Sequence, residues 1–324
     1  MTWDAGLLPE QQIAAGHTGT HARLLAGPGT GKTLTLTRHI CFLVNIHQVN
    51  PEDITAVTFT RAAARELRQR VEADLGEGNL PRISTLHSFA LRQLLRNAPQ
   101  ITTLPQPLRI ADDWEERHII LEDLKTLLRL HDIGNARELL NALSADWQSL
   151  TADEENWELR FPNPQFLAAW REHRMTYGYT LRAELVYQLK KSLEQSGDFR
   201  LDDNICHLLV DEYQDLNRCD LAVIHEIVSR GVELFIAGDD DQSIYGFRKA
   251  HPDGIRRFPR DYAGAHDLTL ELCMRCDPEI LDIGLFVARQ DYRRLEKSIR
   301  PEAGRNGGEV SLSDSVIKNW KRPA

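Results

Sequence analysis

Short apolar runs and longer amphipathic stretches alternate along two parts of the chain. The apolar runs are typical of buried strands, and the longer stretches have the periodicity of helices. We expect strands over residues 22–26, 54–60, 82–86, 205–210, 232–237 and 268–272. We expect helices over residues 34–46, 62–75, 87–96, 219–228 and 278–289. Because strands and helices follow one another in turn, the pattern predicts an α/β fold with a parallel sheet covered by helices.

Residues 99–179 have a different pattern of apolar and polar positions, and no strand pattern is present there. Helical patterns extend over residues 114–130, 136–143 and 164–175, and Pro and Gly residues separate them. A further amphipathic helix over residues 181–193 leads back to the sheet. We therefore expect an all-helical insertion within the α/β fold.

The composition limits the class of protein. The chain has 324 residues, so about two domains are expected. No stretch has the length of a membrane span, and the N-terminus lacks a basic-then-apolar signal. Five scattered cysteines suit a reducing compartment, so we expect a cytoplasmic protein with no membrane partner. A net charge of −9 argues against a wholly basic nucleic-acid coat, but it leaves room for a local basic groove.

A glycine-rich turn follows the first apolar run, and a helical stretch follows the turn at once. Backbone N–H groups in such a turn, together with a helix N-terminus, bind the phosphates of a nucleotide. We expect this role for Gly27, Gly29, Thr30, Gly31 and Lys32, and Thr33 is a candidate ligand of Mg²⁺. Ala26 stands where the pattern has its first glycine. The alternative is an ordinary glycine-rich turn between a strand and a helix.

The apolar run that ends at residue 210 is followed by two acids, Asp211 and Glu212. An Asp at the tip of a strand near a phosphate loop can hold Mg²⁺, and a neighbouring Glu can polarise an attacking water. The alternative is a strand end capped by solvated acids. The phosphate loop upstream on the same sheet pattern favours the functional interpretation.

Two blocks of sequence resemble motifs II and III of the UvrD/Rep/PcrA group of superfamily 1A DNA helicases. The first is Asp211-Glu212-Tyr213-Gln214-Asp215, and the second extends from Gly238 to Arg248. Blocks similar to the Q motif and motifs Ia, Ib and IV of that family stand in the right order at residues 8–12, 58–67, 84–89 and 270–275. The resemblance covers nearly the whole chain. It implies a RecA-like P-loop NTPase fold and an ATP-dependent, 3′-to-5′ helicase or translocase.

The resemblance assigns roles around ATP and Mg²⁺. It implies that Gln11 reads adenine, that Thr33 and Asp211 support the metal, and that Glu212 is the general base. Gln242 takes the position that senses the γ-phosphate, and Arg275 would contact the same phosphate.

The resemblance also assigns contacts with single-stranded DNA, the expected partner. Phe59, Tyr245 and Phe247 match positions that stack on bases, and stacking on aromatic rings tolerates any sequence. His87 and Arg248 would contact the backbone of the strand or link it to the ATP site. The alternative for Phe59, on a strongly apolar strand, is an ordinary core position.

Motif IV departs from the family pattern. Cys273, Met274, Arg275 and Cys276 stand where the family carries Asn-Tyr-Arg-Ser. The arginine is kept, and Met274 could make a soft contact with adenine in place of the tyrosine. A redox or metal role for the C-x-x-C pair is the alternative to an ordinary one, and no second Cys/His pair stands nearby to support it.

The resemblance implies three parts. Residues 1–97 and 178–265 form a first RecA-like ATP-binding domain, residues 98–177 form the inserted helical subdomain, and residues 266–324 begin a second RecA-like domain. Motifs V and VI are missing, so we expect the chain alone to bind ATP–Mg²⁺ but to hydrolyse it slowly. The alternative is a nucleotide-dependent binding module or partner subunit without independent unwinding activity, which recognises DNA or another protein. The missing motor half or a protein partner is a further candidate for association with the chain. A small P-loop GTPase fits poorly, because no Asn-Lys-x-Asp motif is present.

Overall fold

A parallel sheet forms the centre of the molecule in the computed structural model, which describes residues 3–76, 78, 80–98, 101, 103–195, 199–201, 204–243 and 252–310. The strand order is β3-β2-β4-β5-β1-β6, and every neighbouring pair is parallel. The strands are β1 (Ala22–Ala26), β2 (Ile54–Thr58), β3 (Arg82–Thr85), β4 (His207–Val210), β5 (Glu233–Gly238) and β6 (His266–Leu270). The predicted α/β fold with a parallel sheet is therefore confirmed.

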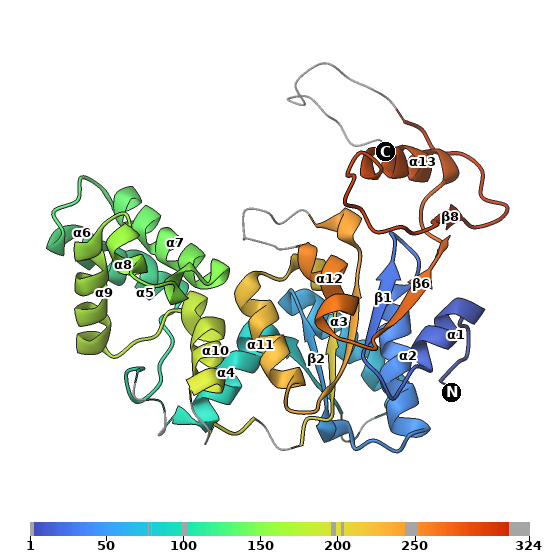
Figure 1. The fold of residues 1–324 in the computed structure, drawn as a ribbon, viewed down its shortest axis with the longest axis horizontal. Helices are drawn as coiled ribbons and strands as arrows, with labels where there is room; N and C mark the ends of the chain where they lie inside the picture. Colours follow the sequence, from blue (N-terminus) through green and yellow to red (C-terminus); the bar gives the residue numbers. More distant parts are fainter. Residues whose placement is uncertain are drawn as a thin grey trace.

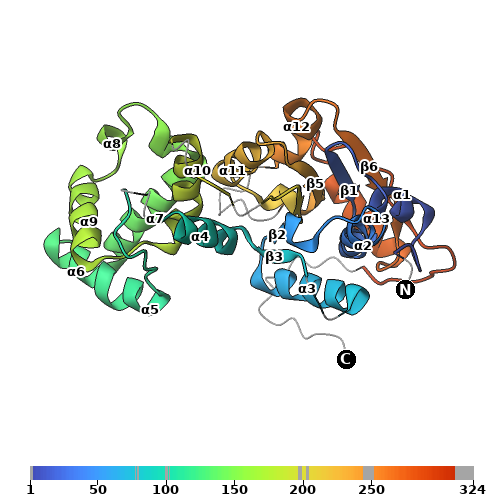
Figure 2. The ribbon, with the colours of Figure 1, turned by 90° about the horizontal axis from the view of Figure 1, so that it is seen from below.

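Two layers of helices cover the sheet, one on each face (Figure 2). One layer holds α1 (Pro9–Ala15), α2 (Lys32–Asn45) and α3 (Arg61–Leu75). The other holds α4 (Leu86–Arg96), α10 (Leu185–Gln195), α11 (Arg218–Val228) and α12 (Asp253–Asp261). Successive strand residues point to opposite faces. In β1, for example, Leu24 packs into the α1–α3 layer and Leu25 into the other.

A group of helices projects from one side of the sheet, between α4 and α10 in the sequence (Figure 1, left). It consists of α5 (Asp113–Glu115), a π-helical turn over Glu116–Ile120, α6 (Leu121–Leu127), α7 (Ile133–Ser149), α8 (Trp157–Arg160) and α9 (Pro164–Tyr177). Its apolar side chains, such as Leu124 and Phe166, continue the core of the adjoining sheet face. Within the described part of this region, the β-structure is a single bridge between Ile110 and Thr180.

The last described segment lies beyond the carboxyl ends of the strands (Figure 1, upper right). Its elements are β7 (Leu272–Cys273), α13 (Pro278–Ala288) and β8 (Arg300–Pro301). Cys273, Leu281 and Leu285 form a small apolar cluster of their own. We refer to residues 272–310 as the C-terminal segment.

Among the described residues, three α-helices were not predicted from the sequence: α1, α8 and α12. Helices α1 and α8 are too short to show a clear period, with 7 and 4 residues. Helix α12 contains Pro259, a residue that normally ends a helix. The predicted helix over residues 114–130 is divided by the π-helical turn. No helix in the described ranges has the length and apolar character needed to cross a membrane.

Candidate nucleotide-binding site

The candidate site lies at the carboxyl edge of the sheet, where β1, β4 and β5 end. A cavity of about 270 Å³ is lined by residues 27–33, which include all the predicted phosphate-binding residues. Glu212, from the loop after β4, and Gln242, from the loop after β5, line the same cavity. Arg275 reaches it from the C-terminal segment. Four stretches of sequence predicted to act on one triphosphate therefore meet around one space.

The backbone of the glycine-rich loop requires its glycines. Gly29 has φ +69° and Gly31 has φ +89°, in the left-handed region that other residues rarely adopt. A side chain at Gly29 would collide with Arg275, and one at Gly31 would collide with Gln11. Helix α2 begins at Lys32, directly after the loop. The partial positive charge of its N-terminus therefore faces the cavity.

Lys32 and the two acids after β4 form a charged group, of which Lys32 and Glu212 line the cavity. The Lys32 ammonium contacts the Glu212 carboxylate directly and lies 4.0 Å from Asp211 Oδ1. Burial raises the pKa of Asp211 to about 6, against the opposing effect of Lys32. Glu212 has φ +53°, a left-handed conformation that is uncommon for this residue type. Strain of this kind is concentrated at functional sites.

Gln214 connects the loop after β4 with the loop after β5. Its Nε2 donates to Glu212 Oε2 at 2.8 Å, and its Oε1 accepts from the Asp239 backbone N–H at 3.0 Å. Asp239 Oδ2 in turn accepts from Gln242 Nε2 at 2.6 Å. Gln214 is buried, and sequence reasoning gave it no role, although it stands within the motif II block. A continuous hydrogen-bonded chain thus joins Glu212 to Gln242.

Gln11 and Met274 hold the glycine-rich loop from outside the cavity. The buried Gln11 side chain accepts from the Leu8 N–H at 3.0 Å and donates to Thr30 O at 3.0 Å. The Met274 N–H donates to Gly29 O at 3.0 Å. Both residues are beside the loop, as an adenine contact would require. A glutamine amide has a second donor and a second acceptor site, so these bonds leave Gln11 capacity for a ligand.

Cys273 and Cys276 are both free thiols. The Cys276 N–H donates to Cys273 Sγ at 3.4 Å, which closes the turn that leads into α13. In the described part of the chain, neither cysteine belongs to a group of three or more potential metal ligands. The hydrogen bond between the two cysteines thus belongs to the structure of this turn.

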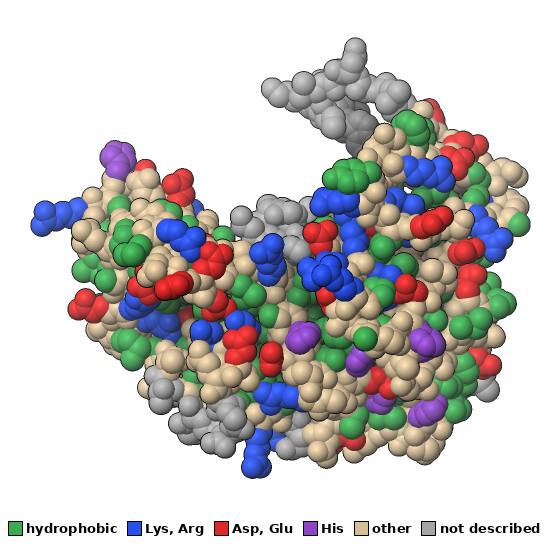
Figure 3. Space-filling model, in the orientation of Figure 1, with side chains coloured by type: hydrophobic (Ala, Val, Ile, Leu, Met, Phe, Trp, Pro, Cys, Tyr) green, Lys and Arg blue, Asp and Glu red, His purple; other side chains and the backbone are tan. Residues whose placement is uncertain are grey.

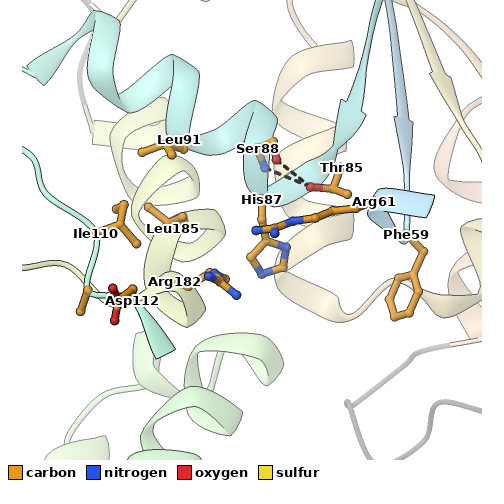
Figure 4. A pocket seen from close by; sticks show the side chains of 11 residues that line it. Phe59, Arg61, Thr85, His87, Ser88, Leu91, Ile110, Asp112, Arg182 and Leu185 are labelled. Carbon is orange, nitrogen blue, oxygen red and sulfur yellow. Dashed lines mark hydrogen bonds between the residues drawn. The ribbon is translucent and has the colours of Figure 1, made fainter. Parts of the chain in front are cut away.

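A second cavity, of about 400 Å³, lies between the sheet and the projecting helices. Phe59 and His87, two predicted DNA contacts, both line it and are both half-buried. Arg61 and Arg182, which sequence reasoning did not select, line it as well. Figure 4 shows Phe59 on the sheet side of this opening and Arg182 on the helical side. Phe59 therefore lies at the surface of a cavity and not within the core.

The remaining predicted DNA contacts, Tyr245, Phe247 and Arg248, lie outside the described residues. Figure 3 shows a hollow in the described surface between the projecting helices and the C-terminal segment. Several Lys and Arg side chains are visible on this face, although the chain as a whole is acidic (Figure 3).

A parallel sheet with a glycine-rich loop after β1 and paired acids after β4 defines a P-loop nucleotide-binding fold. Residues 7–263 match the family described as the UvrD/REP helicase N-terminal domain. The chain is 30% identical to ATP-dependent DNA helicase UvrD1 of Mycobacterium leprae, over 93% of the chain and 41% of the relative. It is 31% identical to ATP-dependent DNA helicase PcrA of Bacillus subtilis, over 92% of the chain and 41% of the relative. It is 30% identical to DNA helicase II of Haemophilus influenzae, over 94% of the chain and 43% of the relative.

The chain belongs to the UvrD/REP helicase family. It spans about two fifths of the length of these curated relatives, 41% to 43%, and matches their N-terminal part. The predicted resemblance is therefore confirmed at the level of the family.

Proposed function

We propose that this chain is the N-terminal motor portion of an ATP-dependent DNA helicase or translocase with 3′-to-5′ polarity. Residues 1–97 and 178–265 would be the first RecA-like domain, residues 98–177 the inserted helical subdomain, and residues 266–324 the start of the second RecA-like domain. The observation that carries the proposal is the single cavity lined by Lys32, Glu212, Gln242 and Arg275. Each of these comes from a different segment, and each suits the chemistry of a triphosphate.

Phosphate binding would use the loop backbone and Lys32. The N–H groups of the glycine-rich loop and the N-terminus of α2 face the cavity and attract an anion. Lys32 would exchange its contact with Glu212 for contacts with the terminal phosphates. Gln11 and Met274, beside the loop, would contact adenine.

The side chains of Thr33 and Asp211 fit a magnesium ion. Mg²⁺ prefers oxygen ligands, and both residues offer oxygen atoms near the phosphate loop. The Asp211 side chain is only 6% exposed, and its nearest cation, Lys32, is 4.0 Å away. A buried carboxylate with so little compensating charge would be stabilised by a divalent cation. When bound, the ion would offset charge on the phosphates.

Hydrolysis would depend on three side chains around the γ-phosphate. Glu212 would accept the proton of the attacking water, and Gln242 would orient that water and sense the phosphate. Arg275 would approach from the C-terminal segment and stabilise charge on the transferred group. The hydrogen-bonded chain through Gln214 and Asp239 would hold Glu212 and Gln242 in fixed positions relative to each other.

Single-stranded DNA would pass over the second cavity. Phe59 would stack on a base, while Arg61, His87 and Arg182 would contact phosphates. Tyr245, Phe247 and Arg248 would extend this contact. ATP-driven movement of the C-terminal segment relative to the sheet would then move the DNA strand.

Two binding measurements on the purified chain test the proposal. A fluorescent ATP analogue with Mg²⁺ and a fluorescent single-stranded oligonucleotide should both bind, and DNA affinity should change with the nucleotide. ATP turnover by the chain alone should be slow. Nucleotide binding without any DNA affinity would favour the alternative, a nucleotide-dependent binding module. Binding of neither would contradict both.

A further inference from the structure

A buried cluster of charged side chains lies beside the nucleotide cavity, in the loop after β5. Three consecutive acids, Asp239, Asp240 and Asp241, form its negative side. Lys297, from the C-terminal segment, enters among them, and its side chain is 1% exposed. Such complete burial of a lysine is rare unless its charge is paired. The cluster therefore joins the C-terminal segment to the loop that carries Gln242.

The three acids differ in how they are paired. Lys297 Nζ contacts the carboxylates of Asp239 and Asp240 and lies 3.1 Å from Asp241 Oδ2. Asp240 also pairs with Arg256 at 3.1 Å, and Asp241 also pairs with Arg294 at 2.9 Å. Of the described cations, Lys297 alone pairs with Asp239. Among the described residues, Asp239 thus has one cationic partner, whereas Asp240 and Asp241 each have a second one.

The same cluster could be taken for a metal site, because the ligand atoms of the three acids lie within 4.8 Å of one another. The Lys297 ammonium contacts all three, however, and supplies the compensating charge. Burial opposes the charge on Lys297, but its acidic partners outweigh burial and raise its pKa. A charged ammonium among the acids excludes a cation from the same place.

Asp239 uses its two carboxylate oxygens for different purposes. Oδ1 contacts Lys297 and accepts from the Asp241 N–H at 3.1 Å, while Oδ2 accepts from Gln242 Nε2 at 2.6 Å. The hydrogen bond to Asp239 Oδ2 therefore turns the NH₂ group of the Gln242 amide toward Asp239. Gln242 Oε1 is then the end of the amide left for a ligand in the cavity that Gln242 lines.

We propose that Lys297 is a positioning residue that fixes the orientation of Gln242 toward the γ-phosphate, because it holds in place the Asp239 carboxylate that accepts a hydrogen bond from the Gln242 amide. The inference rests on the proposed function, because it assigns Gln242 to the phosphate. It adds a physical link from the C-terminal segment to that glutamine. A shift of the segment would move Lys297 relative to Asp239. The position of the Asp239 carboxylate, and with it the orientation of Gln242 toward the nucleotide, would then change.

The test is the preference of the chain for a non-hydrolysable ATP analogue over ADP, measured by titration with Mg²⁺ present. This ratio reports on the γ-phosphate and requires no turnover. Lys297→Met should lower the ratio by about fivefold to tenfold, as Gln242→Ala should, with ADP affinity unchanged within about twofold. The double variant, Lys297→Met with Gln242→Ala, should show no larger fall in the ratio than either single variant, because both substitutions act on the same contact with the γ-phosphate. Lys297→Arg should recover part of the loss.

Arg294→Met is the matched control, because it removes a cation of the same segment that pairs with Asp241 and not with Asp239. It should leave the ratio within about twofold of the wild type. If a thermal melt shows that Lys297→Met is unfolded, Lys297→Met with Asp240→Asn restores the charge balance and should show the same loss.

Three results would overturn the inference: an unchanged ratio in the folded Lys297 variant, additive losses in the double variant, or an equal loss in Arg294→Met. A wild-type chain that binds ADP but shows no preference for the triphosphate would also overturn it. A wild-type chain that binds neither nucleotide would refute the proposed function, and this inference with it.

Discussion

The ammonium group of Lys32 contacts the carboxylate of Glu212, and both residues line the nucleotide cavity. The lysine predicted to bind phosphate and the acid predicted to activate water are thus paired with each other. A triphosphate that enters the cavity would compete with Glu212 for Lys32. The negative charge of Glu212 would also repel the phosphates. In the proposed mechanism, Glu212 would therefore oppose nucleotide binding while it serves hydrolysis.

Glu212→Gln should separate these two effects. Removing the competing charge should raise the affinity for Mg²⁺–ATP by up to about fivefold, the range expected for a partly exposed ion pair. Removing the general base should lower the turnover of ATP by about 10²- to 10⁴-fold. Titration with a fluorescent ATP analogue and single-turnover hydrolysis measure the two quantities. Wild-type turnover in this variant would show that Glu212 is not the base.

Phe59→Ala should weaken binding of single-stranded DNA. Loss of one stacked base is worth about 1–3 kcal/mol, and the loss should be similar for oligonucleotides of different sequence. Tyr292→Ala is the control, because Tyr292 is 92% exposed and lies outside the second cavity. Fluorescence anisotropy at fixed salt measures both. Equal affinity of Phe59→Ala and the wild type would place the DNA elsewhere.

Arg182→Ala should weaken DNA binding in a different manner. If Arg182 contacts a phosphate, its removal should lower the slope of log K against log salt concentration by about one. The measurement is a set of anisotropy titrations at several salt concentrations. A weaker affinity with an unchanged slope would contradict a phosphate contact.

His39 should make the fold sensitive to acid. Its Nδ1 lies 2.9 Å from Ala15 O, its ring stacks on Phe235, and burial lowers its pKa from 6.5 to about 3. Between these values the unfolded chain binds a proton that the folded chain does not bind, so stability falls as the pH falls. The free energy of unfolding should lose about 1.4 kcal/mol per pH unit from this group below pH 6.5.

Urea unfolding at about pH 7.5 and about pH 5 tests this dependence. Between the two pH values, the free energy of unfolding of His39→Gln should fall by about 2 kcal/mol less than that of the wild type. His131→Gln is the control, since the His131 side chain is 92% exposed. An identical loss in His39→Gln and the wild type would contradict the assignment.

The sequence predicted the sheet and the nucleotide cavity well, because both depend on local patterns. The four inner strands, β1, β2, β4 and β5, are short apolar runs, and the segments that carry Lys32, Glu212 and Gln242 follow strands directly. Parallel strands end at one edge, so these side chains had to meet there. The family motifs also placed Arg275 at the cavity, although it belongs to a separate segment.

Lys297 and Arg182 could not be predicted in this way. Lys297 lies in an irregular stretch, 57 residues beyond its partner Asp240 in the sequence. Only the path of the C-terminal segment in space brings it to the loop after β5. Arg182 reaches its cavity because the projecting helices pack beside the sheet, which no local period encodes. Helix α12 was not predicted because it contains Pro259, and a proline argues against a helix interior.

The central claim is that the cavity at the carboxyl edge of the sheet binds the triphosphate through Lys32. Isothermal titration of the wild type and Lys32→Met with a non-hydrolysable ATP analogue and Mg²⁺ tests it most directly, with Lys125→Met as a control on the projecting helices. The wild type and Lys125→Met should bind alike, and Lys32→Met should bind at least about tenfold more weakly, because it loses charge-assisted hydrogen bonds to phosphate. Equal binding by Lys32→Met and the wild type would contradict the account.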